Sequence, residues 1–346
     1  MRFIVTVVLG AMFVYGQAAD ERWKTLNAIG VQLVDVGVYG LAETRLRSAL
    51  VEAERFGERD YRLWATLSNL AFVCREQGKL AEAEGLYRRV VELRERYLGP
   101  EHAAVAGALN NLAATLHLMG RNAEGDPLLR RALTIAEMAE DDHLIASTLN
   151  TLALTLMDLG EAARGEPLLR RALAIFEKLT GPDSLDAAKT RNNLGTIYIA
   201  EREWGRAESE LTAAAAMYEK LLDPEHPLVG KVMGNLYTVL ASEKRAEEGE
   251  PYLRRAIDIA ERASESADTQ RLRDQLARLQ IGRRNYEAAA AVLKEVVDEQ
   301  ERTWGPNSPQ LAAALERYAD VLRKMHQTSE AKRAGDRAQA ILRAFR

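Results

Sequence analysis

The chain has 346 residues and a formal net charge of −4, which argues against a basic surface for nucleic-acid binding. Aromatic residues make up 6% of the sequence, and alanine, leucine, glutamate and arginine dominate, a composition that is typical of helices. The single cysteine, Cys74, excludes an internal disulfide and a cysteine-based metal site. We expect Cys74 to be a buried, inert thiol, because nothing near it in the sequence would activate it.

Residues 1–18 resemble a secretory signal peptide. A positive residue at Arg2 is followed by an apolar run of about 13 residues and by Gly16-Gln17-Ala18, a small-x-small cleavage site. The run is shorter than the roughly 20 residues of a membrane-spanning helix. We therefore expect an exported protein, periplasmic or secreted, whose mature chain begins near Ala19 and does not insert into a membrane; an uncleaved anchor is the alternative.

A repeat of about 40 to 42 residues fills the rest of the chain. One position of the repeat, here called the marker, is occupied in turn by Asn27, Ser68, Asn110, Asn150, Asn192, Gly234, Asp274 and Glu316. Fifteen residues after the marker every copy has alanine or glycine, and twenty-two after it every copy has alanine or valine. Small residues in a fixed register indicate two helices that approach closely. The pattern therefore predicts an all-α solenoid.

Each copy consists of a helix A, a short turn, a helix B and a connector. The turn has glycine in the first four copies and Arg202, Lys244, Arg284 and His326 in the last four. Connectors such as Gly99-Pro100 stop helix B, and a following Asp, Asn or Ser can cap the next helix A. Residues 19–346 therefore form about eight units, at about 22–59, 60–101, 102–141, 142–183, 184–225, 226–265, 266–307 and 308–346.

Three stretches of the repeat are specific: Asn110-Asn111-Leu112-Ala113, residues 188–195 with Gly181-Pro182 before them, and Leu-Arg-Arg-Ala-Leu in several B helices. By these stretches the units resemble a tetratricopeptide array of the kinesin light chain type, from about Trp23 to the end. This resemblance implies a right-handed superhelix whose A helices line a concave face and whose B helices form the outer face. The seventh and eighth copies depart from the Asn-Asn pattern with Asp274-Gln275 and Glu316-Arg317, and the eighth can serve as a cap.

The resemblance places ligand contacts on the A helices, where a row of cations stands out. Three residues before the marker, the fifth to seventh copies carry Lys189, Lys231 and Arg271, and Arg278 follows on the same helix face as Arg271. We predict that this row recruits acidic side chains or a C-terminal carboxylate of a peptide. The alternative is that these charges are merely solvated.

Amide and apolar side chains complete the predicted lining of the concave face. Asn110, Asn150 and Asn192 would project inward, where an amide can both donate to and accept from a peptide backbone. They could equally bridge neighbouring A helices and hold the array together. The second to fourth copies present a more apolar stretch that includes Phe72.

No residue pattern indicates catalysis, a metal or a cofactor. The five histidines are scattered, and there is no Gly-x-Ser-x-Gly or phosphate-binding glycine loop. The paired arginines of the B helices, such as Arg130-Arg131, follow acids at i,i+4 spacing, so we interpret them as structural salt links rather than phosphate clamps.

We therefore predict a non-enzymatic interaction module or scaffold that binds an extended peptide or a helix of a partner protein in the concave groove. The alternative is a structural scaffold that oligomerises through its outer face or its ends. An enzyme is least expected, because all units have similar lengths and no insertion could hold an active-site loop. The sequence predicts neither the partner nor the oligomeric state.

Overall fold

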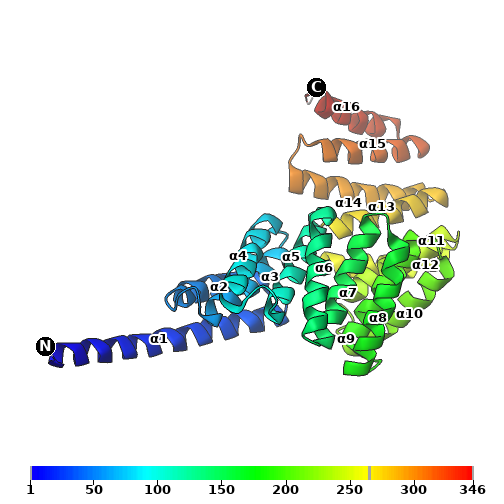
Figure 1. Ribbon diagram of the computed structural model, residues 1–346. Helices are drawn as coiled ribbons and strands as arrows, with labels where there is room; N and C mark the ends of the chain where they lie inside the picture. Colours follow the sequence, from blue (N-terminus) through cyan, green and yellow to red (C-terminus); the bar gives the residue numbers. More distant parts are fainter. Residues whose placement is uncertain (1, 264–265, 345–346) are drawn as a thin grey trace. The chain divides into compact units, whose positions relative to one another are not determined.

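The computed structural model describes the backbone of residues 2–263 and 266–344, and the side chains of residues 18–34, 36–263 and 269–344 (Figure 1). Within these ranges the chain is all-helical, with sixteen α-helices and no strand. The helices form two compact units, Met1–Pro182 and Asp183–Arg346, which are described separately.

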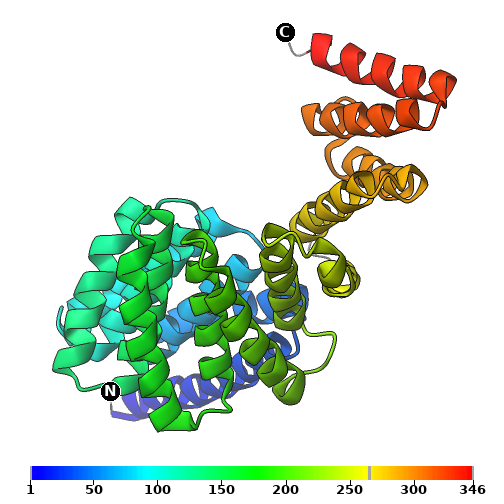
Figure 2. The ribbon, with the colours of Figure 1, turned by 90° about the vertical axis from the view of Figure 1, so that its right-hand side faces the viewer.

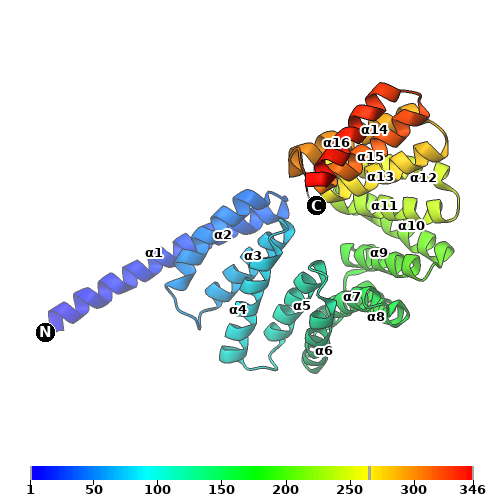
Figure 3. The ribbon, with the colours of Figure 1, turned by 90° about the horizontal axis from the view of Figure 1, so that it is seen from above.

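The first unit contains four consecutive helix pairs, and each helix packs against its partner in the pair. The pairs are α1 (Arg2–Asp35) with α2 (Tyr39–Glu54), α3 (Tyr61–Glu76) with α4 (Leu80–Leu98), α5 (Ala103–Leu118) with α6 (Asn122–Met138), and α7 (Asp142–Asp158) with α8 (Ala162–Thr180). Helix α1 extends beyond α2 at its N-terminal end (Figure 3). The first helix of each pair corresponds to helix A of the repeat and the second to helix B.

The second unit continues the same arrangement with four further pairs. They are α9 (Leu185–Ala200) with α10 (Trp204–Leu221), α11 (Pro227–Ser242) with α12 (Ala246–Arg262), α13 (Ser266–Gly282) with α14 (Tyr286–Trp304), and α15 (Pro309–Lys324) with α16 (Thr328–Ala344). Helices α13 to α16 follow one another as a stack (Figure 2). Helix α16 buries Ala331, Ala334, Ala338 and Ile341 and exposes polar residues on its other side.

The small residues in fixed register lie where paired helices meet. All eight residues at the alanine-or-glycine position are buried: Ala42, Ala83, Gly125, Gly165, Ala207, Gly249, Ala289 and Ala331. At Gly249 a Cβ atom would lie only 2.9 Å from the ring of Tyr237, so the glycine makes room for this aromatic residue. The residues at the alanine-or-valine position, from Ala49 to Ala338, are likewise fully buried.

The turns between paired helices share one backbone shape. All eight turn residues have positive φ, from 60° at Arg202 to 82° at Gly160. The next residue then donates its N–H to a carbonyl five residues back, as Lys79 does to Cys74 and Glu203 does to Tyr198, both at 2.8 Å. The four non-glycine turns therefore keep the geometry that glycine provides elsewhere.

The connectors end in N-caps for the following A helices. Ser184 and Ser308 cap α9 and α15 through their side chains, as the sequence predicts. Two histidines also act as caps: Nδ1 of His102 accepts the N–H of Ala104, and Nδ1 of His226 accepts the N–H of Leu228, each at 3.1 Å. The sequence analysis did not identify these histidine caps.

No helix in the described part of the chain combines the length and apolar composition that crossing a bilayer requires. The expected signal segment, 1–18, falls almost entirely on residues whose side chains lie outside the described ranges, so its cleavage remains a prediction.

Candidate functional site

Three of the predicted site residues form a row on successive A helices of the second unit. Lys189 on α9, Lys231 on α11 and Arg271 on α13 are all exposed. Burial lowers the pKa of His226, the cap of α11, and the positive charges of Lys189 and Lys231 lower it further, which places both lysines near this histidine. Lys231 and Arg271 line a common shallow hollow. We call Lys189, Lys231 and Arg271 the cation row.

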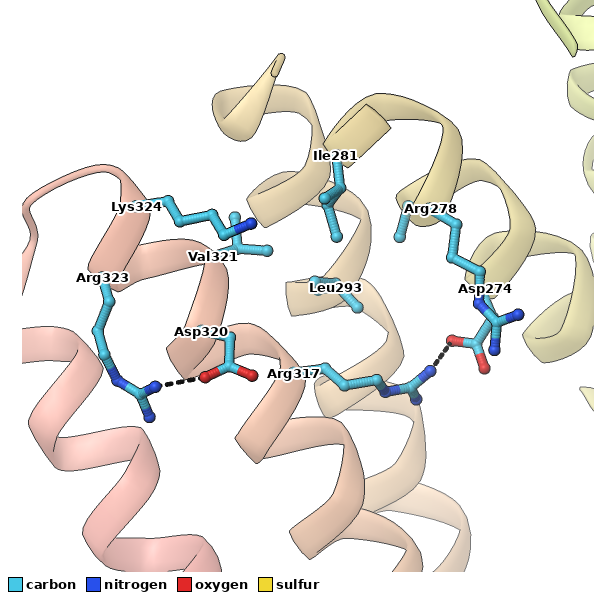
Figure 4. Close-up of a pocket in the computed structure, with 10 residues that line it drawn as sticks. Asp274, Arg278, Ile281, Leu293, Arg317, Asp320, Val321, Arg323 and Lys324 are labelled. Atoms are coloured by element: carbon cyan, nitrogen blue, oxygen red, sulfur yellow. Dashed lines mark hydrogen bonds and ion pairs between the residues drawn. The ribbon is translucent and has the colours of Figure 1, made fainter. Parts of the chain in front are cut away.

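The fourth predicted cation, Arg278, lies at a larger hollow, which we call the α13–α15 pocket (Figure 4). Its volume is about 420 Å³, and α13, α14 and α15 supply its walls. Apolar atoms form its floor and charged side chains form its rim. The lining residues are Asp274, Ala277, Arg278, Ile281, Leu293, Arg317, Asp320, Val321, Arg323 and Lys324.

Most charged side chains at this rim already interact with another side chain. Arg317 reaches from α15 to Asp274 on α13, with Nη1 2.7 Å from Oδ1, and Arg323 forms an ion pair with Asp320 one turn away. The ammonium of Lys324 lies 5.4 Å from the centre of the Tyr286 ring. Arg278, by contrast, forms no ion pair with any residue in the described part of the chain.

The marker residues link neighbouring A helices. Oδ1 of Asn192 accepts a hydrogen bond from Nδ2 of Asn235 at 3.2 Å, and Oδ1 of Asn27 accepts one from Nδ2 of Asn69 at 3.3 Å. In both cases the residue after the marker donates to the marker of the preceding copy. The ion pair between Asp274 and Arg317 occupies this same register. Asn192 therefore bridges neighbouring A helices, as the alternative in the sequence analysis proposed. Contact of Asn192 with a partner peptide remains a prediction.

The other predicted residues lie in the first unit. Asn110 on α5 and Asn150 on α7 are half-buried. Oδ1 of Asn110 is buried without a hydrogen-bond partner among the described residues. Phe72 is half-buried on α3, packs against the core around Leu70 and Cys74, and has the guanidinium of Arg75 4.9 Å from its ring centre. The contacts of these residues with a partner remain a prediction.

The sequence analysis missed most of the α13–α15 pocket. It treated Asp274 and Arg317 as departures from the family pattern, whereas they form the link above the pocket. The signal was present in the sequence, since an acid at one marker is followed by a base just after the next marker. Leu293 and Val321 gave no such signal, because they resemble ordinary core residues.

The paired arginines of the outer face are structural. In each pair the first arginine bonds an acid of its own helix: Arg130 pairs with Asp126, Arg170 with Glu166 and Arg254 with Glu250. The second reaches an acid of the preceding B helix: Arg131 pairs with Glu95, Arg171 with Glu137 and Arg255 with Glu219. These pairs therefore link neighbouring repeats.

The environment of Cys74 does not favour metal binding. Its sulfur lies with carboxylate oxygens of Glu43 and Glu82 within 4.8 Å of one another. Burial raises the pKa of the Cys74 thiol to about 11, so the thiolate that a metal requires is disfavoured. A hydrogen bond from Lys79, together with one from Arg47, lowers the pKa of Glu43 to about 2, and its charge is already compensated.

Consecutive helix pairs with a fixed register of small residues define an array of helix hairpins. Residues 62–138 and 144–220 match the tetratricopeptide repeat family. These residues are tetratricopeptide repeats, and the resemblance seen in the sequence is confirmed. No curated protein matched the chain.

Several solved structures are similar to this chain. BtubC (BKLC) from P. vanneervenii is 25% identical with a TM-score of 0.52, over 64% of this chain and 90% of that one. A Rap protein complexed with competence and sporulation factor is 15% identical with a TM-score of 0.58, over 94% of this chain and 98% of that one. The apo form of the quorum sensor NprR from B. thuringiensis is 13% identical with a TM-score of 0.64, over 99% and 93%. Because the last two are only 15% and 13% identical to this chain, their similarity shows only that they share its fold.

Proposed function

We propose that this protein is a non-enzymatic binding module that captures a segment of a partner protein along the A helices of its second unit. The observation that carries the proposal is the cation row of Lys189, Lys231 and Arg271. These exposed charges of one sign occupy one register position on three successive A helices, in a protein with a net charge of −4. Carboxylates of a partner would be attracted to this concentration of positive charge.

The spacing of the cation row specifies the ligand further. Packed helices lie about 8–10 Å apart, and an extended peptide in the polyproline II conformation rises about 3.1 Å per residue with about three residues per turn. A peptide that crosses the A helices therefore presents about every third residue to the next cation. We expect acidic residues at such a spacing, or one acidic residue and the C-terminal carboxylate, in the bound segment.

Affinity capture with a charge-matched control tests this function. The bait is the chain from Ala19 onward, compared with a Lys189→Glu, Lys231→Glu, Arg271→Glu variant and with a Lys294→Glu, Lys332→Glu, Arg333→Glu variant. The control removes three exposed cations from the B helices α14 and α16, so both variants have the same net charge. We expect the unmodified and control baits to retain the same partner and the cation-row variant to lose it. Equal retention by all three baits would contradict the proposal and favour the outer face or the ends.

We also propose that the protein is exported and cleaved after Ala18. Ala19 is buried, and Oδ1 of Asp20 lies 2.5 Å from Arg62, so a chain that begins at Ala19 keeps both of these contacts. N-terminal sequencing of the protein recovered outside the cytoplasm should read Ala-Asp-Glu-Arg. Recovery of a chain that still begins at Met1 would contradict cleavage.

A further inference from the structure

The α13–α15 pocket has the size and lining of a small-molecule site. Its volume of about 420 Å³ falls in the range of roughly 300–1,000 Å³ that is usual for such sites. Ala277, Ile281, Leu293 and Val321 give it an apolar floor. Ala277, Leu293 and Val321 belong to one buried core shared by α13, α14 and α15, and Ile281 packs against it, so the floor is held rigidly.

The pocket is open because the link between α13 and α15 is long. Asn192 and Asn235 join α9 to α11 through two short amide side chains. At the same register, α13 and α15 are joined through Asp274 and Arg317. Arginine reaches much farther than asparagine, and the side chain of Arg317 reaches from α15 to Asp274 on α13, passing beside Leu293 (Figure 4).

The charges at the rim select an anion with one acidic group. The lining contains four cations and two carboxylates, and both carboxylates are paired, with Arg317 and with Arg323. Lys324 lies against the ring of Tyr286. Lys324 and Arg278 are the two rim cations that form no ion pair with a described residue, and because Lys324 already contacts a ring, Arg278 is the better partner for a carboxylate. A guanidinium binds one carboxylate in a two-pronged arrangement.

We propose that the α13–α15 pocket binds a small amphiphilic carboxylate. Its apolar group lies on Ile281, Leu293 and Val321, and its carboxylate pairs with Arg278. This site is separate from the cation row and does not depend on capture of a protein partner. The charge of Arg278 favours an acid over an amine of the same shape, and the apolar floor favours an acid with a hydrocarbon group over acetate.

Methyl NMR of the whole chain tests the proposal with a defined probe, 4-phenylbutyrate. The δ1-methyl group of Ile281 reports on the pocket, and that of Ile257, which lines a different hollow, is the control for site specificity. Titrations with 4-phenylbutylamine and with acetate separate charge from apolar contact. The variants are Arg278→Gln, Lys324→Gln and, as a matched control, Arg333→Gln on the exposed side of α16.

We expect saturable shifts of Ile281 with 4-phenylbutyrate and weaker or no shifts with acetate and 4-phenylbutylamine. Arg278→Gln should weaken binding about tenfold or more, because a charge-assisted hydrogen bond is lost. Lys324→Gln should weaken it less, and Arg333→Gln should leave it unchanged. Circular dichroism checks that the variants keep their helicity. The proposal is overturned if Ile281 does not shift, if the amine binds as well as the acid, or if Arg278→Gln binds as tightly as the unmodified protein.

Discussion

The left-handed turn residues show how single positions preserve the repeat. Glycine adopts positive φ without steric cost, whereas Arg202, Lys244, Arg284 and His326 adopt it at a cost of roughly 1–2 kcal/mol each. They persist because the hydrogen bonds of the turn, such as that from Glu203 to Tyr198, fix the chain there. The sequence did not predict the shape of these four turns. A glycine at the turn indicates positive φ, but another residue there does not indicate which φ the backbone adopts.

The histidine cap of α11 couples stability to pH. Nδ1 of His226 must be unprotonated to accept the N–H of Leu228. Burial and the nearby Lys189 and Lys231 lower the pKa of His226 in the folded state. The unfolded chain therefore binds a proton more readily than the folded chain, and stability rises with pH in this range.

We predict that the His226 cap contributes fully to the free energy of unfolding above about pH 6.5. This contribution is lost as the pH falls through the lowered pKa of His226. The loss should be up to about 1 kcal/mol, the usual value of an N-cap. Urea unfolding between about pH 4.5 and pH 7.5 measures it. His226→Asn keeps a capping side chain without a titrating group, so its stability should depend less on pH. An unchanged pH dependence in this variant would contradict the prediction.

At the scale of the helix pair, stability depends on close approach at the small residues. Ala207 is fully buried on α10, and its counterpart in the preceding copy, Gly165, is also buried. Where a larger residue enters this interface, as Tyr237 does, a glycine faces it. The interface therefore tolerates a change in volume only when the opposite side compensates.

We predict that Ala207→Leu lowers the free energy of unfolding by about 1–3 kcal/mol through overpacking, or splits the unfolding transition. Ala216→Leu on the exposed side of the same helix is the control and should have little effect. Denaturant unfolding followed by circular dichroism measures both. Equal stability of the two variants would show that the register of the small residues is assigned incorrectly.

The helix pairs were predictable from the sequence, but the α13–α15 pocket was not. Small residues and turn residues recur locally, so each helix pair can be recognised from its own segment. The pocket depends on the lengths of Asp274 and Arg317, which lie in different copies, and on which cations already have partners. The same limit applies to the cation row. The sequence predicted its members, but only the structure places Lys189 and Lys231 near His226 and Lys231 at the same hollow as Arg271.

At the scale of the whole molecule, the tetratricopeptide repeats within each unit pack mainly on their neighbours. Ion pairs between successive B helices, such as Arg131 with Glu95, reinforce the stacking, although exposed pairs contribute only about 0–1 kcal/mol each. The outer arginines link neighbouring repeats, whereas Lys189, Lys231 and Arg271 share one exposed register position on the A helices. This consideration supports the cation row as the central functional feature.

Site-specific photo-crosslinking in the producing cell tests that claim most directly. A photoreactive benzoylphenylalanine replaces either Lys231, in the middle of the cation row, or Lys332, on the outer side of α16. Our account predicts a discrete crosslinked partner from position 231, lost when Lys189 and Arg271 are changed to glutamate, and none from position 332. A partner crosslinked from position 332 but not from position 231 would contradict binding along the A helices.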